Sequence, residues 1–378
     1  MLPLSRLTLI AGCMAAAFAA ETSKPFTSQQ RRWWALQAAV RTAPSGTAGN
    51  PIDAFILAKL AEKRVVPSAQ ADKITRLRRV TLDLTGLMPA PEEVQAFVAD
   101  ESPAAFEKVV DRLLSSPRYG ERWARHWLDL ARYSDSEGFK SDETRPNIWR
   151  YRDYVIDSFN ADKPYDRFVK EQIAGDELYP GNAQALIATG FNRHFPDESN
   201  ARNLMQRRQE LLNDITDTVG ATFLGLTYAC ARCHDHKFDP ILQKDYYRLQ
   251  AFFANTRIED GARLMPAAKL ERWEAQQKVW DSKTRDIRDQ MERLVEPARA
   301  RMFKEGFDKF PPEIQDAILT KPEQRSAFQW QMYYKAKPQV EFPVAEAAKK
   351  LKGEDQRRWA DLEAQLKRFD SIKPEEMP

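Results

Sequence analysis

The chain has 378 residues, of which 43% are hydrophobic, enough for a sizeable core in one large domain or two ordinary ones. Charged residues make up 30% and only 14 residues are glycine, which favours helices over a β fold with many glycine turns. The 58 basic and 55 acidic residues nearly cancel to a formal charge of +3, so the composition excludes a dedicated binder of nucleic acid or of anionic membranes.

The first twenty residues differ from the rest and predict an export signal. A basic residue precedes an apolar stretch at 7–18 that is too short to span a bilayer, and Ala17-Phe18-Ala19 offers an A-x-A cleavage pattern. We therefore expect residues 1–20 to be removed and the mature protein to work in the periplasm or at the cell surface. A second interpretation is a lipoprotein, because residues 10–13 resemble a bacterial lipobox in which Cys13 carries the lipid. No other segment is long and apolar enough to cross a membrane.

Helical patterns begin after an N-terminal arm and linker at residues 21–50. Pro51 occupies the first turn of a predicted helix, and Thr85-Gly86-Leu87-Met88-Pro89 predicts a sharp stop. Aromatic residues gather between 119 and 168, and no stretch alternates polar and apolar residues as a strand would. The sequence predicts a mainly α fold, with an irregular multi-helix globular body over residues 51–260.

After residue 260, apolar residues recur at a heptad spacing, as they do in a coiled coil. A second series of this kind lies within 344–369. Two such helices, with shorter helices between them, predict a long antiparallel helical hairpin that forms an arm over residues 261–378. The first series consists of Trp273, Trp280, Ile287 and Leu294, with Val279 and Met291 beside it.

The strongest chemical signal is Cys230-Ala231-Arg232-Cys233-His234, the spacing at which c-type haem is attached. Two cysteines one helical turn apart are placed to form thioethers with the two vinyl groups of one porphyrin, and His234 is placed to supply an axial nitrogen. Once the signal is removed, Cys230 and Cys233 are the only thiols, and a disulfide between them closes too small a loop to stabilise the fold. Haem attachment outside the cytoplasm agrees with the predicted export.

Three other interpretations of the cysteine pair stay open. Cys230, Cys233 and His236, with Asp239 nearby, form a donor set for zinc or for non-haem iron. A redox-active thiol pair is the second, although no βαβ pattern surrounds it. The third is a buried pair of cysteines with no cofactor.

The second axial ligand of the predicted haem is open as well. His236 lies too near His234 to reach the opposite face of the haem, and the remaining histidines are His126 and His194.

An acidic stretch carries a weaker signal for a carbohydrate-active enzyme, oxidative or hydrolytic. Its carboxylates are candidates for a general acid and base or for Ca²⁺ ligands, and aromatic neighbours such as Trp127 suit the stacking of sugars. The alternative is a solvated loop whose acids pair with nearby arginines. The stretch comprises Asp129, Asp135, Glu137, Asp142 and Glu143.

Several segments resemble those of the planctomycete cytochrome c-like proteins, large exported bacterial proteins with a central domain of unknown function. The resemblance covers about residues 30–260 and includes the wording Cys-x-x-Cys-His-Asp-His-Lys-Phe-Asp-Pro. The segments that carry it are 50–56, 79–87, 116–123, 126–133, 188–193 and 230–241.

This resemblance implies an exported, cytochrome-linked protein but supplies no reaction. Family members often carry a separate cytochrome domain upstream and continue into a second conserved domain, and we expect this chain to lack both. We therefore expect electron transfer to or from a redox partner, or to the missing C-terminal domain as a separate chain. A polysaccharide substrate remains the alternative expectation.

Overall fold

The computed structural model describes residues 26–43, 49–139, 142–197, 203–258, 262, 264 and 267–375. Within these ranges the regular structure is helical, apart from one antiparallel bridge between Ser136 and Thr144. The prediction of a mainly α, multi-helix fold is thus confirmed. The export signal predicted at residues 1–20 lies outside the described residues, as does Cys13.

Local capping explains where the first helices begin and end. Helix α3 (Pro51–Lys63) starts with proline, whose missing N–H needs no partner in the first turn. Helix α4 (Lys73–Thr85) is capped by Asp72, whose side chain accepts a hydrogen bond from the Thr75 amide at 2.8 Å. It ends at Gly86, where a φ of 72° favours glycine, so the sharp stop predicted there is confirmed.

The chain divides into two compact units. The motif unit comprises residues 1–70 and 227–249, and the large unit comprises 71–226 and 250–378. The domain boundaries predicted from the sequence stay predictions. The motif unit contains α2 (Ser28–Arg31), η1 (Trp34–Leu36), α3, η3 (Tyr228–Arg232) and most of α12 (Gln243–Phe252).

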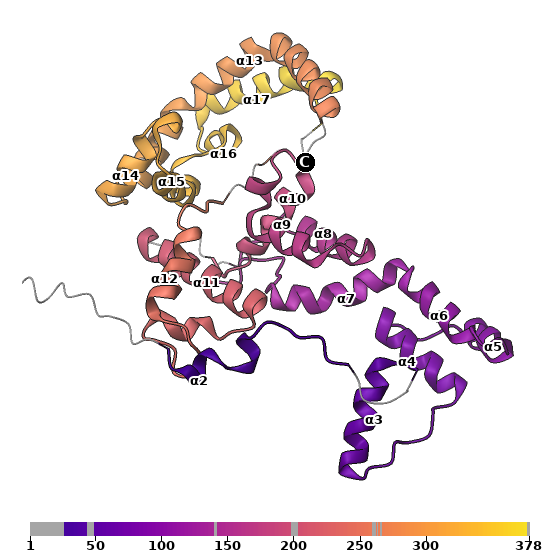
Figure 1. Ribbon diagram of the computed structural model, residues 1–378. Helices are drawn as coiled ribbons and strands as arrows, with labels where there is room; N and C mark the ends of the chain where they lie inside the picture. Colours follow the sequence, from indigo (N-terminus) through magenta and orange to yellow (C-terminus); the bar gives the residue numbers. More distant parts are fainter. Residues whose placement is uncertain are drawn as a thin grey trace, which may run out of the picture. The chain divides into compact units, whose positions relative to one another are not determined.

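The large unit is built from helices on both sides of the motif segment in the sequence (Figure 1). Besides α4, it contains α5 (Pro91–Ala99), α6 (Ala105–Leu114), α7 (Pro117–Leu130), α8 (Trp149–Asn160), α9 (Tyr165–Leu178), α10 (Ala183–Ala188), η2 (Thr189–Arg193), α11 (Leu204–Leu224), α13 (Ala267–Phe307), α14 (Pro312–Leu319), η4 (Pro322–Gln324), α15 (Ala327–Val340), α16 (Val344–Ala348), α17 (Gly353–Lys367) and η5 (Asp370–Ile372).

Aromatic side chains with satisfied polar ends form the centre of the large unit. Trp127 of α7 donates its indole N–H to Gln172 Oε1 at 2.8 Å, and the Tyr151 hydroxyl donates to the same oxygen at 2.7 Å. All three side chains are buried. Helices α7 and α8 approach closely at Gly120, where a Cβ would lie 2.5 Å from the Ile156 carbonyl oxygen. These members of the aromatic segment therefore form core, whereas Phe139, Trp149 and Tyr165 of the same segment are at least 40% exposed.

The predicted antiparallel hairpin is present near the C-terminus (Figure 1). Trp273, near the start of α13, donates its indole N–H to the carbonyl oxygen of Glu375, beyond the end of α17, at 2.8 Å. At the other end of α13, Gly306 packs against α15, where a Cβ would lie 1.9 Å from the Gln339 carbonyl oxygen. The short helices α14 to α16 connect α13 to α17. Because the start of α13 contacts the chain beyond the end of α17, the two helices run antiparallel.

The buried face of α13 is shifted from the predicted heptad series. The most buried side chains are those of Thr284, Met291, Val295 and Ala298, each at most 7% exposed. The four predicted residues at 273, 280, 287 and 294 are half-buried beside this face, and Val279 is 48% exposed. The sequence therefore predicted the helical spacing of the apolar residues but not the centre of the buried face. The two tryptophans of the predicted series lie beside that centre, where smaller residues such as Thr284 and Ala298 are buried.

A buried carboxylate on α9 provides a test of the packing in the large unit. Glu171 is 2% exposed and accepts hydrogen bonds from Tyr154 at 2.8 Å, Lys163 at 2.6 Å and Arg167 at 2.8 Å. Burial raises the pKa of this carboxyl, but the hydrogen bonds outweigh burial and bring it below its ordinary value. The ionised form is thus stabilised in the folded protein.

We expect Glu171→Gln to lower the free energy of unfolding by about 2 kcal/mol at neutral pH, because two cations lose their buried partner while Arg167 stays partly solvated. Since the folded pKa is depressed, this contribution is complete above the unfolded pKa and is lost as the pH falls through the folded value. Urea unfolding at several pH values measures both effects. Asp166→Asn, on the same helix in an exposed pair, is the control and should change stability little.

Candidate functional site

The cysteine motif lies on a short turn that has both buried and exposed members. Helix η3 ends at Arg232, and Cys233 follows in a right-handed helical conformation. Tyr228 and Ala231 are buried, whereas Cys230 and Cys233 are exposed free thiols. The apolar members of the turn anchor it, and both sulfur-bearing residues face solvent.

Helix α12 holds the backbone of this turn. The Arg232 carbonyl oxygen accepts two hydrogen bonds at 3.1 Å, one from the Gln243 side-chain amide and one from the Tyr247 hydroxyl. The Tyr228 ring stacks on that of Tyr246 with ring centres 6.1 Å apart. The turn is therefore fixed by side chains of α12 through contacts that involve neither thiol and not the His234 ring.

His234 is exposed, and its tautomer is set by its neighbour. Its Nδ1 lies 2.8 Å from the Asp235 carbonyl oxygen. Because a carbonyl oxygen only accepts, Nδ1 carries the proton and the lone pair of the neutral ring is on Nε2. The Asp235 side chain accepts a hydrogen bond of 2.9 Å from the backbone N–H of Gln243, at the start of α12. This bond holds Asp235 in place beside His234.

His236 is buried, and its two ring nitrogens have the opposite roles to those of His234. Its side chain is 5% exposed, and its Nδ1 accepts the backbone N–H of Asp239 at 2.8 Å and that of Phe238 at 3.3 Å. Asp239 Oδ2 is farther from Nδ1, at 3.4 Å. The neutral ring therefore carries its proton on Nε2, which donates to Thr227 Oγ1 at 3.0 Å. Its lone pair is already engaged by backbone amides, so metal coordination requires breaking them.

The donor set predicted for zinc or non-haem iron does not converge in the part of the chain that is described, where no group of three or more His, Cys, Asp or Glu side chains is arranged to hold a metal ion. Asp235, beside the motif, accepts from the backbone N–H of Gln243 instead, and the backbone N–H of Asp239 donates to His236. The ligand assignments for Cys230, Cys233, His234 and His236 stay predictions.

The other two histidines lie in the large unit. His126 is exposed on α7, and its ring contacts that of Trp123 with centres 5.5 Å apart. His194 is 3% exposed and donates from Nδ1 to the Ala131 carbonyl oxygen at 3.0 Å. Burial, followed by the charges of nearby arginines, lowers the pKa of His194 to about 3, so this ring is neutral at neutral pH.

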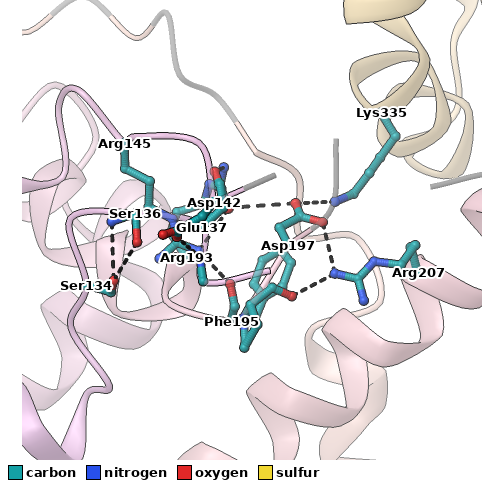
Figure 2. A network of polar contacts seen from close by, with 12 residues as sticks. Ser134, Ser136, Glu137, Asp142, Arg145, Arg193, Phe195, Asp197, Arg207 and Lys335 are labelled. Atoms are coloured by element: carbon teal, nitrogen blue, oxygen red, sulfur yellow. Dashed lines mark hydrogen bonds and ion pairs between the residues drawn. The ribbon is translucent and has the colours of Figure 1, made fainter. Parts of the chain in front are cut away.

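The acidic stretch does not form a shared pocket with Trp127. That indole is buried, whereas Asp129 and Asp135 are exposed, and Asp135 accepts from the Tyr133 hydroxyl at 2.6 Å. Glu137 is the buried member: it accepts from Arg145 at 2.9 Å and from Arg193 at 2.7 Å (Figure 2). This arrangement matches the interpretation of loop acids paired with arginines.

The structure adds a buried ion-pair network that the sequence did not reveal. Asp197, 9% exposed on its side chain, lies 3.2 Å from Arg207 and is paired with Lys335 of α15 (Figure 2). Burial, the largest influence, lowers the pKa of Lys335 although Asp197 opposes this. Residues 138 positions apart thus join α15 to the loop after η2.

A comparison with protein-family models gives the class of the chain. Residues 51–258 match PSCyt2, described as "Protein of unknown function (DUF1549)". The chain therefore belongs to this family, whose matched region contains the Cys230–His234 motif. No curated protein and no solved structure matches the chain. None of the helices in the described ranges combines the length and the apolar character needed to cross a membrane.

The network at Asp197 predicts a large effect of a single isosteric change. We expect Asp197→Asn to lower the free energy of unfolding by about 3 kcal/mol, because Lys335 would lose the carboxylate paired with its buried charge, whereas Arg207 keeps its ion pair with Glu210. Chemical denaturation measures this loss. Lys337→Met, on the same helix at an exposed position, is the control, and a loss as large as that of Asp197→Asn would contradict the assignment.

The buried neutral His194 predicts part of the acid sensitivity. Because its folded pKa is about 3 and its ordinary value is 6.5, protonation favours the unfolded chain, and stability falls as the pH drops through this window. His194→Asn keeps a donor near Ala131 and removes this titration. We expect a shallower decline of unfolding free energy between these pH values, measured by denaturation at fixed pH steps. A decline as steep as that of the wild type would contradict this assignment.

Proposed function

We propose that this chain is an exported c-type haem protein that transfers electrons to or from a partner. The haem would be bound covalently by Cys230 and Cys233, with His234 as one axial ligand. The observation that carries the proposal is that both thiols and the His234 ring are exposed on one anchored turn, with the His234 lone pair on Nε2.

The residues of the cysteine turn fit a covalently bound haem. Covalent attachment needs two accessible thiols, and both cysteines are free and exposed. Iron ligation needs an imidazole lone pair held by a hydrogen bond at the other nitrogen, which the Asp235 carbonyl supplies to His234 at 2.8 Å. When bound, a haem supplies one-electron redox chemistry. The chain contributes the anchored turn and the orientation of His234.

The bonds of His236 support haem over the mixed metal site, because its lone pair is engaged by the amides of Phe238 and Asp239. The burial of Trp127 and the exposure of Asp129 give no support to a sugar-binding site in the acidic stretch. Export rests on the sequence of residues 1–20, and the redox partner is proposed from the chemistry of the haem alone.

The test is expression of the full chain with a cytochrome-maturation system, followed by intact mass and absorption spectra. We expect the mass of one haem on the exported chain and a covalent Soret-absorbing species, both lost in the double variant Cys230→Ala, Cys233→Ala. His126→Gln is the matched control for a histidine outside the motif and should retain the covalent haem. One zinc per chain without covalent haem would instead select the metal alternative.

A further inference from the structure

We propose that His236 is a positioning residue: its ring clamps the loop around the cysteine motif and does not bind metal or iron. The role in haem attachment rests on the proposed function, whereas the clamp itself is a property of the unloaded chain.

The clamp spans the motif. On one side of it, Thr227 precedes Cys230, and its Oγ1 accepts a hydrogen bond from His236 Nε2 at 3.0 Å. On the other side, the amides of Phe238 and Asp239 follow His234 and donate to Nδ1. One side chain thus ties together two backbone segments that enclose all three motif residues. The backbone N–H of His236 adds a bond of 2.8 Å to the Ile241 carbonyl oxygen.

Burial sets His236 apart from its surroundings. Its side chain is 5% exposed, while His234 and Phe238 beside it are exposed, Phe238 at 75%. A short loop without strands has few ways to satisfy its amides, and an imidazole offers one acceptor and one donor at a fixed separation. The ring therefore fills the interior of the loop, where a solvated histidine would leave these amides without an acceptor.

The clamp has a consequence for attachment. Two thiols and one imidazole must meet the same planar group, and a loop that is already ordered avoids the entropy cost of arranging them. His234 donates from Nδ1 to the carbonyl oxygen of the adjacent Asp235, so its direction depends on the path of the loop on either side. Loosening the clamp should therefore reduce haem loading without altering which atoms bind the iron.

Variants of Thr227 distinguish a clamp role of His236 from a ligand role, because the Thr227 hydroxyl contacts His236 and Thr227 is not among the predicted ligands. Thr227→Val removes the acceptor for Nε2 at an exposed position, and Thr227→Ser restores a hydroxyl. His236→Asn retains an acceptor near the position of Nδ1, whereas His236→Ala removes both bonds. Each variant is made in the full chain, with circular dichroism to confirm folding.

The first measurement is hydrogen exchange at the Asp239 amide in the reduced, unloaded protein. We expect exchange on the order of fivefold faster in His236→Ala and a smaller increase in Thr227→Val, with Thr227→Ser close to the wild type and His236→Asn intermediate. Unchanged exchange in both His236→Ala and Thr227→Val would overturn the clamp.

The second measurement is covalent haem per chain under limiting maturation, with the spectrum of the loaded protein. We expect Thr227→Val and His236→Ala to lower the loaded fraction while the band positions stay those of the wild type. A shifted spectrum in His236→Ala with a normal Thr227→Val would identify His236 as a ligand and overturn the proposal. If the wild type carries no haem but exchange still accelerates as expected, the clamp stands and the haem function fails.

Discussion

The hydrogen bonds between α12 and the backbone of the cysteine turn are the constraint on which the candidate site depends. A segment that presents two thiols and an imidazole to solvent cannot use those side chains to hold itself in place. Instead, the turn is held by the Arg232 carbonyl, which accepts two side-chain hydrogen bonds, and by the stacked rings of Tyr228 and Tyr246. The turn is thus ordered through groups other than the two thiols and the His234 ring, which the proposed haem attachment requires to be accessible.

The large unit solves a related problem in its core. Its aromatic residues bring polar atoms into the interior, where each unpaired donor or acceptor is costly. Gln172 resolves this for Trp127 and Tyr151 by accepting from both, and Glu171 accepts from Tyr154. Trp127, Tyr151 and Tyr154 are therefore packed in the core and are not available for the stacking of sugars.

Local features of the sequence were predictable and distant pairings were not. The helix start at Pro51 and the stop at Gly86 depend on neighbours within a few residues, so the pattern determines them. The cysteine turn, in contrast, is held by residues of α12 that lie 11 and 15 positions from Arg232. The centre of the buried face on α13 depends on which side chains α15 to α17 present to it, and the heptad spacing alone does not specify this. The pairing of Asp197 with Lys335 joins residues 138 positions apart, and no local pattern reports it.

His234 in the motif and His236 just after it show that residue type alone does not identify a ligand. His234 and His236 stand two positions apart, and a search by donor type treats both as ligands. The backbone distinguishes them, because a carbonyl oxygen faces Nδ1 of His234 and amide N–H groups face Nδ1 of His236. The first contact leaves a lone pair on Nε2 of an exposed ring, and the second consumes the lone pair of a buried one. The proposal that His234 is a ligand and His236 a clamp rests on the direction of these hydrogen bonds, which cannot be deduced from the spacing of the motif.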